Sequence, residues 1–246
     1  MITICCPSRG RPHLANRMVK TLFNTVSDKK NVEILFYLND DDEQLHLYKE
    51  LLDPRYYVVG PDQSTCFSWN QLADRAKGDI VFLAGDDIQF LTKDWDLEFE
   101  KVFNQYDDKI CMVVPWDGNS KGKGAEHKGK TVPVIVKDEP IGAPHFAVHK
   151  NWIKALGYFA PPFFWHWYVD SYTQTVSRKL DRCILLPYVI VQAKKVFDDT
   201  GVKVRKHLNI NTRDDYVWSK IQGRYVEADV NALKIFIENF NSRKDL

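Results

Sequence analysis

The chain has 246 residues, of which 44% are hydrophobic and 27% charged, and this balance is ordinary for a globular protein and excludes a disordered one. No apolar run is long enough to span a bilayer and the N-terminus lacks a secretory signal, so we expect a cytoplasmic protein without a transmembrane segment. The five cysteines are an odd number without a CxxC pair, which predicts reduced thiols rather than disulfides or a zinc site.

Charge is distributed unevenly along the chain, although the formal net charge is only +1. Residues 1–39 carry a net +4, residues 40–108 a net −11 and residues 109–246 a net +8. An acidic centre suits a cation site, and a basic last block suits an anionic partner. Ordinary solvated surface charge explains the same pattern, so charge alone leaves both interpretations open.

Short apolar runs alternate with helical patterns through the first 90 residues. The expected strands are residues 2–6, 32–38, 55–59 and 77–83, and the expected helices begin at Pro12, near Leu45 and at Ser68. This alternation predicts a mostly parallel central sheet flanked by helices on both faces, as in a Rossmann-like α/β unit. Ligands bind beyond the carboxyl ends of such strands, so the loops PSRGRP, NDDDE, GPDQ and GDD should converge on one pocket.

The pattern becomes less regular beyond residue 90, where we expect a mixed second half of the same single domain. Expected strands are KICMVVPW, VPVIV, PHFAVH and CILLPYVIVQA, and expected helices are residues 94–105, a segment ending at Gly157, a segment after Asp170 and a last helix through Val230 and Leu233. We find no internal repeat and no obvious linker.

Two adjacent aspartates, Asp86 and Asp87, follow the buried strand in VFLAGDDIQF. A strand holds such carboxylates rigidly at its end, one on each side of the chain, so that one can bind a hard divalent cation while the other accepts hydrogen bonds from a ligand hydroxyl. An isolated Asp-Asp pair is more often a turn or a helix cap. The strand position and the acidic central block favour the cation site here.

The motifs CPSRGRP, VEILFYLNDDD, NQLADRAKGDIVFLAGDDIQFLTKDWD and GAPHFAVHKNWIKALGYF, in this order, resemble glycosyltransferases of the GT-A fold, most of all the inverting enzymes of family 2. The resemblance extends over roughly residues 1–215, and residues 68–96 are its most specific part. It implies one GT-A domain over residues 1–246, with a nucleotide-sugar-binding half at 1–105 and an acceptor-binding half at 106–246.

The resemblance also implies roles for individual residues. The residues expected to bind the nucleotide-sugar are Pro7, Ser8, Arg9, Arg11, Asn39, Asp40, Asn70 and Asp86. Asp87 would hold Mn²⁺ or Mg²⁺, which neutralises the charge of the departing nucleoside diphosphate. The motif usually written DxD reads Gly85, Asp86, Asp87, so its first carboxylate is absent and a second metal ligand becomes more important. His207 matches the late histidine that completes the metal shell in many such enzymes.

Asp170, in FFWHWYVDSY, matches the catalytic base of the inverting enzymes. Its aromatic neighbours would raise its pKa, which suits proton abstraction from an acceptor hydroxyl. Helix capping is the alternative role for this residue. The implied reaction is a direct displacement with inversion, although the fold also supports retention.

The acceptor is less well defined by the sequence. The aromatic stretch 158–168 could stack on sugar rings or on a nucleobase, or simply pack in the core, and KGKGAEHKGK could bind a phosphate backbone. The expected acceptor is therefore a glycan or a hydroxymethylated DNA base, as in the sugar transfers that some bacteriophages make to their own DNA. A non-catalytic nucleotide-sugar or glycan-binding module is the alternative function. A polymerase palm is disfavoured because the chain is too short for fingers, palm and thumb.

Overall fold

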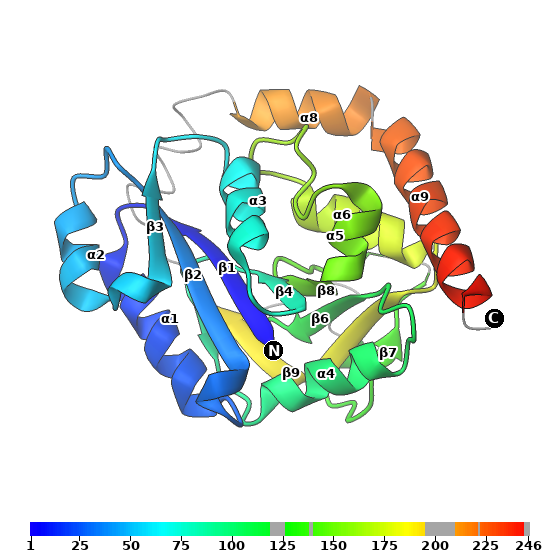
Figure 1. Ribbon diagram of the computed structural model, residues 1–246, viewed down its shortest axis with the longest axis horizontal. Coiled ribbons are helices and arrows are strands. Elements are labelled where there is room, and N and C mark those ends of the chain that lie inside the picture. Colours follow the sequence, from blue (N-terminus) through cyan, green and yellow to red (C-terminus); the bar gives the residue numbers. More distant parts are fainter. Residues whose placement is uncertain (119–125, 138–139, 195–209, 221, 244–246) are drawn as a thin grey trace.

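The computed structural model describes residues 1–118, 126–137, 140–194, 210–220 and 222–243. Its centre is a nine-stranded sheet with the strand order β3-β2-β1-β4-β8-β6-β9-β5, and β7 pairs with β9 beside this path (Figure 1).

The first half of the chain forms the parallel part of this sheet. Strands β1 (Ile2–Ser8), β2 (Val32–Asn39), β3 (Tyr57–Gly60) and β4 (Ile80–Leu83) pair in parallel, and helices α1 (Pro12–Thr25), α2 (Leu45–Leu51) and α3 (Thr65–Arg75) connect them. The third strand begins two residues later than expected. The Asp53 carboxylate accepts the Arg55 N–H and sets a short 3-10 turn over Pro54–Tyr56 before the strand.

The second half is mixed, as the sequence predicts. Strand β8 (Phe146–His149) runs antiparallel between β4 and β6 (Met112–Trp116), and β9 (Cys183–Ala193) is parallel to β6. Two short strands, β5 (Ile88–Phe90) and β7 (Val134–Ile135), pair antiparallel with β9. The second-half helices are α4 (Trp95–Asn104), α5 (Lys150–Leu156), α6 (Val169–Arg178), α8 (Ile210–Lys220) and α9 (Gln222–Ser242).

Helices cover both faces of the sheet, because strand residues alternate between two cores. Ile2, Ile4 and Cys6 of β1 pack on one face in a cluster with residues of α1, α2 and α4. Cys5 points to the other face, into a cluster with residues of α3, α5, α6, α8 and α9. In Figure 1, α8 crosses one end of the molecule and α9 runs down its side. All five cysteines are free and buried, as expected.

The expected α/β fold class is therefore confirmed. Within the described residues, none of the helices is both long and apolar enough to cross a membrane. Two expectations fall outside these residues: His207, and the first half of the basic loop KGKGAEHKGK, of which residues 126–130 are described.

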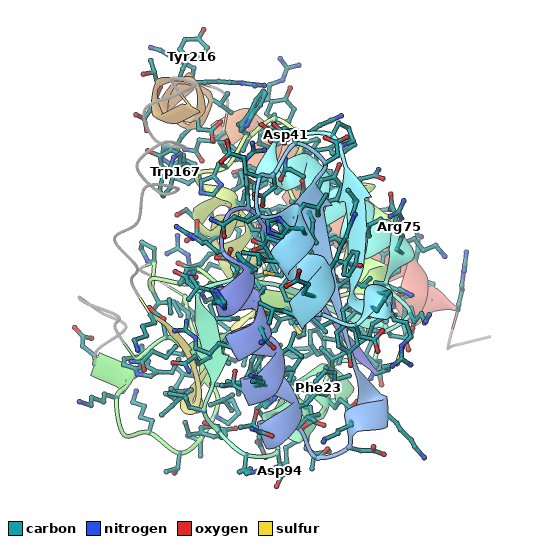
Figure 2. All side chains as sticks on the ribbon, turned by 90° about the vertical axis from the view of Figure 1, so that its left-hand side faces the viewer. Phe23, Asp41, Arg75, Asp94, Trp167 and Tyr216 are labelled. Carbon is teal, nitrogen blue, oxygen red and sulfur yellow. The ribbon has the colours of Figure 1, made fainter. Side chains whose placement is uncertain are left out.

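The carboxyl ends of the parallel strands lie at one end of the molecule. Asp41, just beyond β2, lies at the same end as Trp167 and Tyr216, while Phe23 and Asp94 mark the opposite end (Figure 2). The expected ligand loops and the aromatic segment of the second half thus share one end of the fold.

Candidate functional site at the carboxyl ends of the strands

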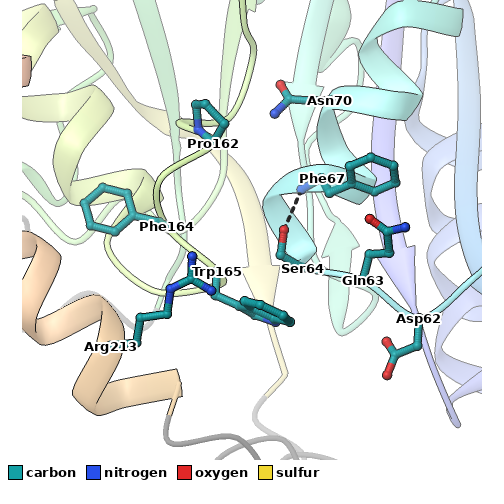
Figure 3. Close-up of a pocket in the computed structure, with 9 residues that line it drawn as sticks. All are labelled: Asp62, Gln63, Ser64, Phe67, Asn70, Pro162, Phe164, Trp165 and Arg213. Atoms are coloured by element: carbon teal, nitrogen blue, oxygen red, sulfur yellow. Dashed lines mark hydrogen bonds between the residues drawn. The ribbon is translucent and has the colours of Figure 1, made fainter.

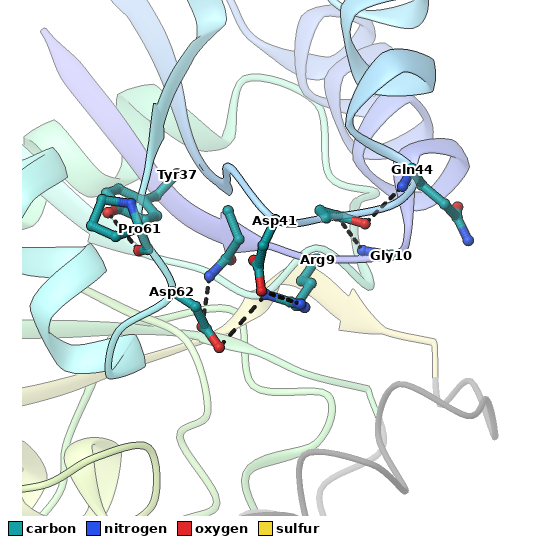
Figure 4. A network of polar contacts seen from close by, with 9 residues as sticks. Arg9, Gly10, Tyr37, Asp41, Gln44, Pro61 and Asp62 are labelled. Carbon is teal, nitrogen blue, oxygen red and sulfur yellow. Dashed lines mark hydrogen bonds and ion pairs between the residues drawn. The ribbon is translucent and has the colours of Figure 1, made fainter.

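The loops after β1, β2 and β3 meet through a network of ionic hydrogen bonds (Figure 4). The Arg9 guanidinium donates to both oxygens of Asp41, at 2.6 and 2.9 Å, and lies 3.6 Å from Asp62. The Asn39 amide donates to the other oxygen of Asp62 at 2.6 Å. The predicted convergence of these loops is therefore observed, and the charge of Arg9 is already matched by carboxylates.

Asp40 and Pro7 were also expected to bind the nucleotide-sugar. Asp40 is exposed, and its backbone N–H donates to the carbonyl of Gly60 at 2.8 Å. Pro7 is half-buried within β1, opposite Tyr37 of β2. Both lie at the same strand ends as Arg9 and Asn39.

Asp86 points into the protein and is held by residues of the first loop. Its carboxylate accepts a hydrogen bond from Ser8 Oγ at 2.7 Å and one from the Arg11 guanidinium at 3.2 Å. The Tyr48 hydroxyl accepts the Arg11 backbone N–H at 2.8 Å and lies 2.7 Å from Ser8 Oγ. Because Ser8 donates to Asp86, Tyr48 must donate to Ser8. The protons therefore run in one direction, from Tyr48 through Ser8 to Asp86.

Burial dominates the electrostatics of Asp86, which is only 5% exposed. Desolvation raises the pKa of this carboxyl to about 6, although Arg11 and the Ser8 hydrogen bond act in the opposite direction. Asp86 is thus a rigid acceptor behind the strand edge and carries its negative charge only above mildly acidic pH.

Asp87, in the turn between β4 and β5, is half-buried. Its backbone carbonyl accepts hydrogen bonds from Arg17 and from the Lys194 N–H, each at 3.0 Å, which fixes the turn. Next to it, Gly85 leaves open a space in which a Cβ atom would lie 3.1 Å from Asp87 Oδ1 and 3.7 Å from His145 Cε1. The position of the missing first carboxylate is therefore bordered by an aspartate and an imidazole.

His145 immediately precedes β8 and is 6% exposed. Among the described residues, neither of its ring nitrogens has a hydrogen-bond partner. Burial lowers its pKa to about 4, so the imidazole is neutral at physiological pH. From the sequence alone this histidine received little weight, because a lone histidine is more often a structural residue.

A cavity of about 400 Å³ extends from this edge toward the second half (Figure 3). Its lining residues are Asp62, Gln63, Ser64, Phe67, Asn70, Pro162, Phe164, Trp165 and Arg213. The Asn70 side chain accepts the N–H groups of Phe159 and Ala160 at 2.8 and 2.9 Å and donates to the Ala160 carbonyl at 2.8 Å. Its amide therefore fixes the wall of the cavity as well as lining it.

The aromatic segment 163–168 is anchored to α8 by three consecutive residues. The Arg213 guanidinium lies 4.9 Å from the centroid of the Trp165 ring, and the Asp215 carboxylate accepts the Tyr168 hydroxyl. Between them Asp214, which is fully buried, accepts the backbone N–H groups of residues 165, 166 and 167 at 2.8, 2.9 and 2.8 Å. Helix α8 thus sets the position of the segment.

Asp170 borders a second cavity, of about 440 Å³. The lining residues are Trp167, Tyr168, Asp170, Ser171 and Asp215. Asp170 lies in the first turn of α6 and does not cap it, because the capping position is Tyr168. Burial raises the pKa of its carboxyl above the ordinary value, and backbone and Ser171 hydrogen bonds partly oppose this shift.

The expected divalent ion can be tested against this geometry. The described residues contain no group of three or more His, Cys, Asp or Glu side chains that could enclose a metal ion. Mg²⁺-like ions, however, are commonly bound by one or two carboxylates together with substrate phosphates and water. Asp87 offers such a carboxylate, and at this edge the carboxylates of residues 41, 42, 62, 86 and 87 outnumber the guanidinium groups of Arg9, Arg11 and Arg17. The negative charge at this edge of the sheet therefore suits a divalent cation that binds together with a diphosphate.

Several residues of the site were not expected from the sequence: Tyr48, Arg213, Asp214 and Asp215. Asp62 lies in the loop GPDQ, which was expected at the pocket, and His145 was only a weak candidate because a lone histidine is more often structural. The available signal for the three residues of α8 was the charged run TRDD in the first half of that helix. Their partners lie far away in the chain, so the sequence pattern could not reveal their contacts.

Comparisons with known proteins place this geometry in context. No protein-family model and no curated protein matches the sequence. Among solved structures, the mannosyltransferase PcManGT from Pyrobaculum calidifontis, in complex with GDP-Man and Mn²⁺, superimposes with a TM-score of 0.60 at 13% identity over 95% of this chain and 74% of that chain.

Residues 1–349 of S. aureus TarS give a second match. In complex with UDP-GlcNAc they superimpose with a TM-score of 0.56 at 14% identity over 80% of this chain and 59% of that chain. Another structure of the same TarS fragment gives a TM-score of 0.57 at 13% identity over 97% of this chain and 82% of that chain. The resemblance noted in the sequence is confirmed at the level of structure, because this chain has the GT-A-like fold of these glycosyltransferases.

Proposed function

We propose that the protein is a glycosyltransferase that moves a sugar from a nucleoside-diphosphate sugar to an acceptor hydroxyl. The observation that carries this proposal is the position of Asp86 and Asp87 at the end of β4, where the loops of the neighbouring parallel strands meet, in a fold shared with glycosyltransferases. Nucleotide ligands bind at this edge of open α/β sheets. The solved structures of PcManGT and TarS with GDP-Man, UDP and UDP-GlcNAc support a donor of the same class.

The donor would lie across the strand ends. Its base and ribose would contact the loop residues Pro7, Asn39 and Asp40, and its diphosphate would lie near Arg11. Asp86 would accept a ribose hydroxyl from its fixed position behind Ser8. The first cavity begins at Asp62, which is already bonded to Asn39, so the sugar has room to extend toward Asn70 and Trp165.

Asp87 would hold Mn²⁺ or Mg²⁺, and His207 remains the proposed second protein ligand. When bound, such an ion supplies positive charge against the diphosphate leaving group. The surplus of carboxylates at the edge supports this requirement, since a diphosphate without a cation would be repelled there.

Asp170 would act as the catalytic base. Its carboxylate takes the proton of an acceptor hydroxyl while that oxygen forms a bond to the anomeric carbon, and the bond from this carbon to the diphosphate oxygen breaks. Attack from the face opposite the leaving group inverts the anomeric configuration. The raised pKa of Asp170 and its place in an open cavity support this role. The acceptor would be a glycan or a hydroxymethylated DNA base.

The direct test is the release of nucleoside diphosphate from UDP-GlcNAc and GDP-mannose with Mn²⁺, in the presence and absence of a mixture of methyl glycosides. Asp170→Asn should reduce release by about 100-fold or more and leave donor affinity within about twofold, because a base acts on the reaction step and not on donor binding. Asp181→Asn is the matched control, since Asp181 is exposed and has a positive φ of 55° that asparagine tolerates. Donor binding without any release would instead indicate a non-catalytic nucleotide-sugar-binding module.

A further inference from the structure

The second cavity differs in charge from the first. Its lining offers the carboxylates of Asp170 and Asp215, the rings of Trp167 and Tyr168, and the Ser171 hydroxyl, and none of these described lining residues is cationic. The first cavity, by contrast, carries the Arg213 guanidinium against Trp165. The described lining of the second cavity thus offers carboxylates, aromatic rings and a hydroxyl, whereas that of the first also offers a guanidinium.

The walls of the second cavity are held in place before any ligand binds. Tyr168 stacks on Trp218 of α8 with ring centroids 4.9 Å apart and an interplanar angle of 12°, and its hydroxyl donates to Asp215. The backbone N–H of Trp167 is bonded to the buried Asp214 at 2.8 Å. A ligand that enters this cavity meets a preformed surface, so little affinity is lost to ordering the protein.

This surface suits an uncharged carbohydrate. Sugar rings present C–H faces that pack on aromatic side chains, and their hydroxyls donate hydrogen bonds to carboxylates. A phosphate group in the same place would lie close to Asp170 and Asp215, and the described lining residues include no cationic side chain to offset the repulsion. The volume of about 440 Å³ is sufficient for one or two sugar units.

We propose that the acceptor bound in this cavity is an uncharged sugar unit, one hydroxyl of which donates to Asp170 while the ring packs against Trp167 and Tyr168. Asp215 then acts as a specificity-determining residue that excludes phosphorylated sugars and nucleic-acid backbone. This inference rests on the proposed function for the role of Asp170, but the binding preference itself does not depend on catalysis.

The test measures binding by ligand-observed NMR with saturation transfer. The probes are the methyl glycosides of glucose, galactose, mannose and N-acetylglucosamine, the 6-phosphates of the same sugars, and a single-stranded oligonucleotide that contains hydroxymethylcytosine. At least one neutral glycoside should bind, at least about tenfold more tightly than its 6-phosphate. Asp215→Lys should reduce this preference by about tenfold or more, and Asp170→Asn should weaken the binding of the neutral glycoside.

Asp74→Lys is the control for the charge change, because it makes the same substitution at an exposed carboxylate of helix α3 that does not line the cavity. Thermal melts of each variant check that the fold is intact. The inference is overturned if no neutral glycoside of the panel binds, if the 6-phosphate or the oligonucleotide binds as well as the neutral sugar, or if Asp74→Lys changes the preference as much as Asp215→Lys.

A separate measurement of donor binding, by thermal melting with nucleotide-sugars and Mn²⁺, distinguishes a failure of the acceptor inference from a failure of the proposed function. Donor binding without glycoside binding refutes the acceptor inference alone. Glycoside binding without donor binding supports the inference about the cavity but refutes the transferase, and leaves a glycan-binding module.

Discussion

Replacing Asp214 with alanine removes the carboxylate that holds the aromatic segment on α8. Three backbone N–H groups at residues 165–167 would lose an acceptor at 2.8 to 2.9 Å inside a fully buried environment. Hydrogen bonds to a charged group contribute about 1.5 to 3 kcal/mol each, but they converge on one carboxylate whose own burial is costly, so the terms do not add. We expect a loss of about 3 to 5 kcal/mol in the free energy of unfolding and a fall of about 10 °C in Tm.

Urea unfolding followed by tryptophan fluorescence measures this loss, because Trp165, Trp167 and Trp218 lie in or beside the segment. Asp215→Ala is the matched control: the same substitution on the next residue of the same helix, but at an exposed carboxylate, which should cost less than about 1 kcal/mol. If the two variants lose the same stability, or if Asp214→Ala unfolds like the wild type, Asp214 does not anchor the segment and the reasoning fails.

Three further predictions concern single groups of the site. Burial lowers the pKa of His145 from 6.5 to about 4, so the stability that its neutral form contributes is fully present above about pH 6.5 and is lost as the pH falls toward 4. Over this pH range the wild type should lose about 3 kcal/mol more free energy of unfolding than His145→Phe, as measured by urea unfolding. An equal loss in the two proteins would contradict this. Desolvation raises the pKa of Asp170, and the base is active only when ionised, so the acidic limb of the kcat/KM profile should lie above the ordinary range of an aspartate. A limb near pH 4 would exclude Asp170 as the base. Gly85→Ala would place a Cβ 3.1 Å from Asp87 Oδ1 and displace that carboxylate. The Mn²⁺ concentration needed for half-maximal donor binding should therefore rise about tenfold, while the free energy of unfolding falls by less than about 1 kcal/mol. An unchanged Mn²⁺ requirement would argue against Asp87 as a ligand.

The sequence was sufficient for the parallel half of the fold because each strand there is a continuous apolar run that ends in a polar loop. The same rule placed Asp86 and Asp87 at the edge of the sheet, where Asp86 is buried and Asp87 half-buried. The expectation that they face opposite sides of the chain stays a prediction. Strand β5 was missed because three residues after a turn carry too little periodicity to be distinguished from a loop.

The contacts of the second half could not be predicted for a different reason. Asp214 binds backbone groups that lie 47 to 49 residues earlier in the chain, and no local pattern encodes such a pairing. The same is true of Arg9, which was expected to meet phosphates and is paired with Asp41 from another loop. His145 resembled an ordinary core histidine, and only the structure shows that its nitrogens have no partner among the described residues.

The most direct test of the account is thermal melting of the wild type and Asp87→Ala against a panel of uridine, guanosine, adenosine and thymidine diphosphate sugars, each with and without Mn²⁺. At a ligand concentration of 100 times Kd, binding stabilises the native state by about 2.7 kcal/mol, which raises Tm by about 5 to 10 °C for a chain of this size. We predict such a shift for one nucleotide class, only with Mn²⁺ and only in the wild type. No shift with any donor, or the same shift without Mn²⁺ and in the variant, would contradict a metal-assisted nucleotide-sugar site at the end of β4.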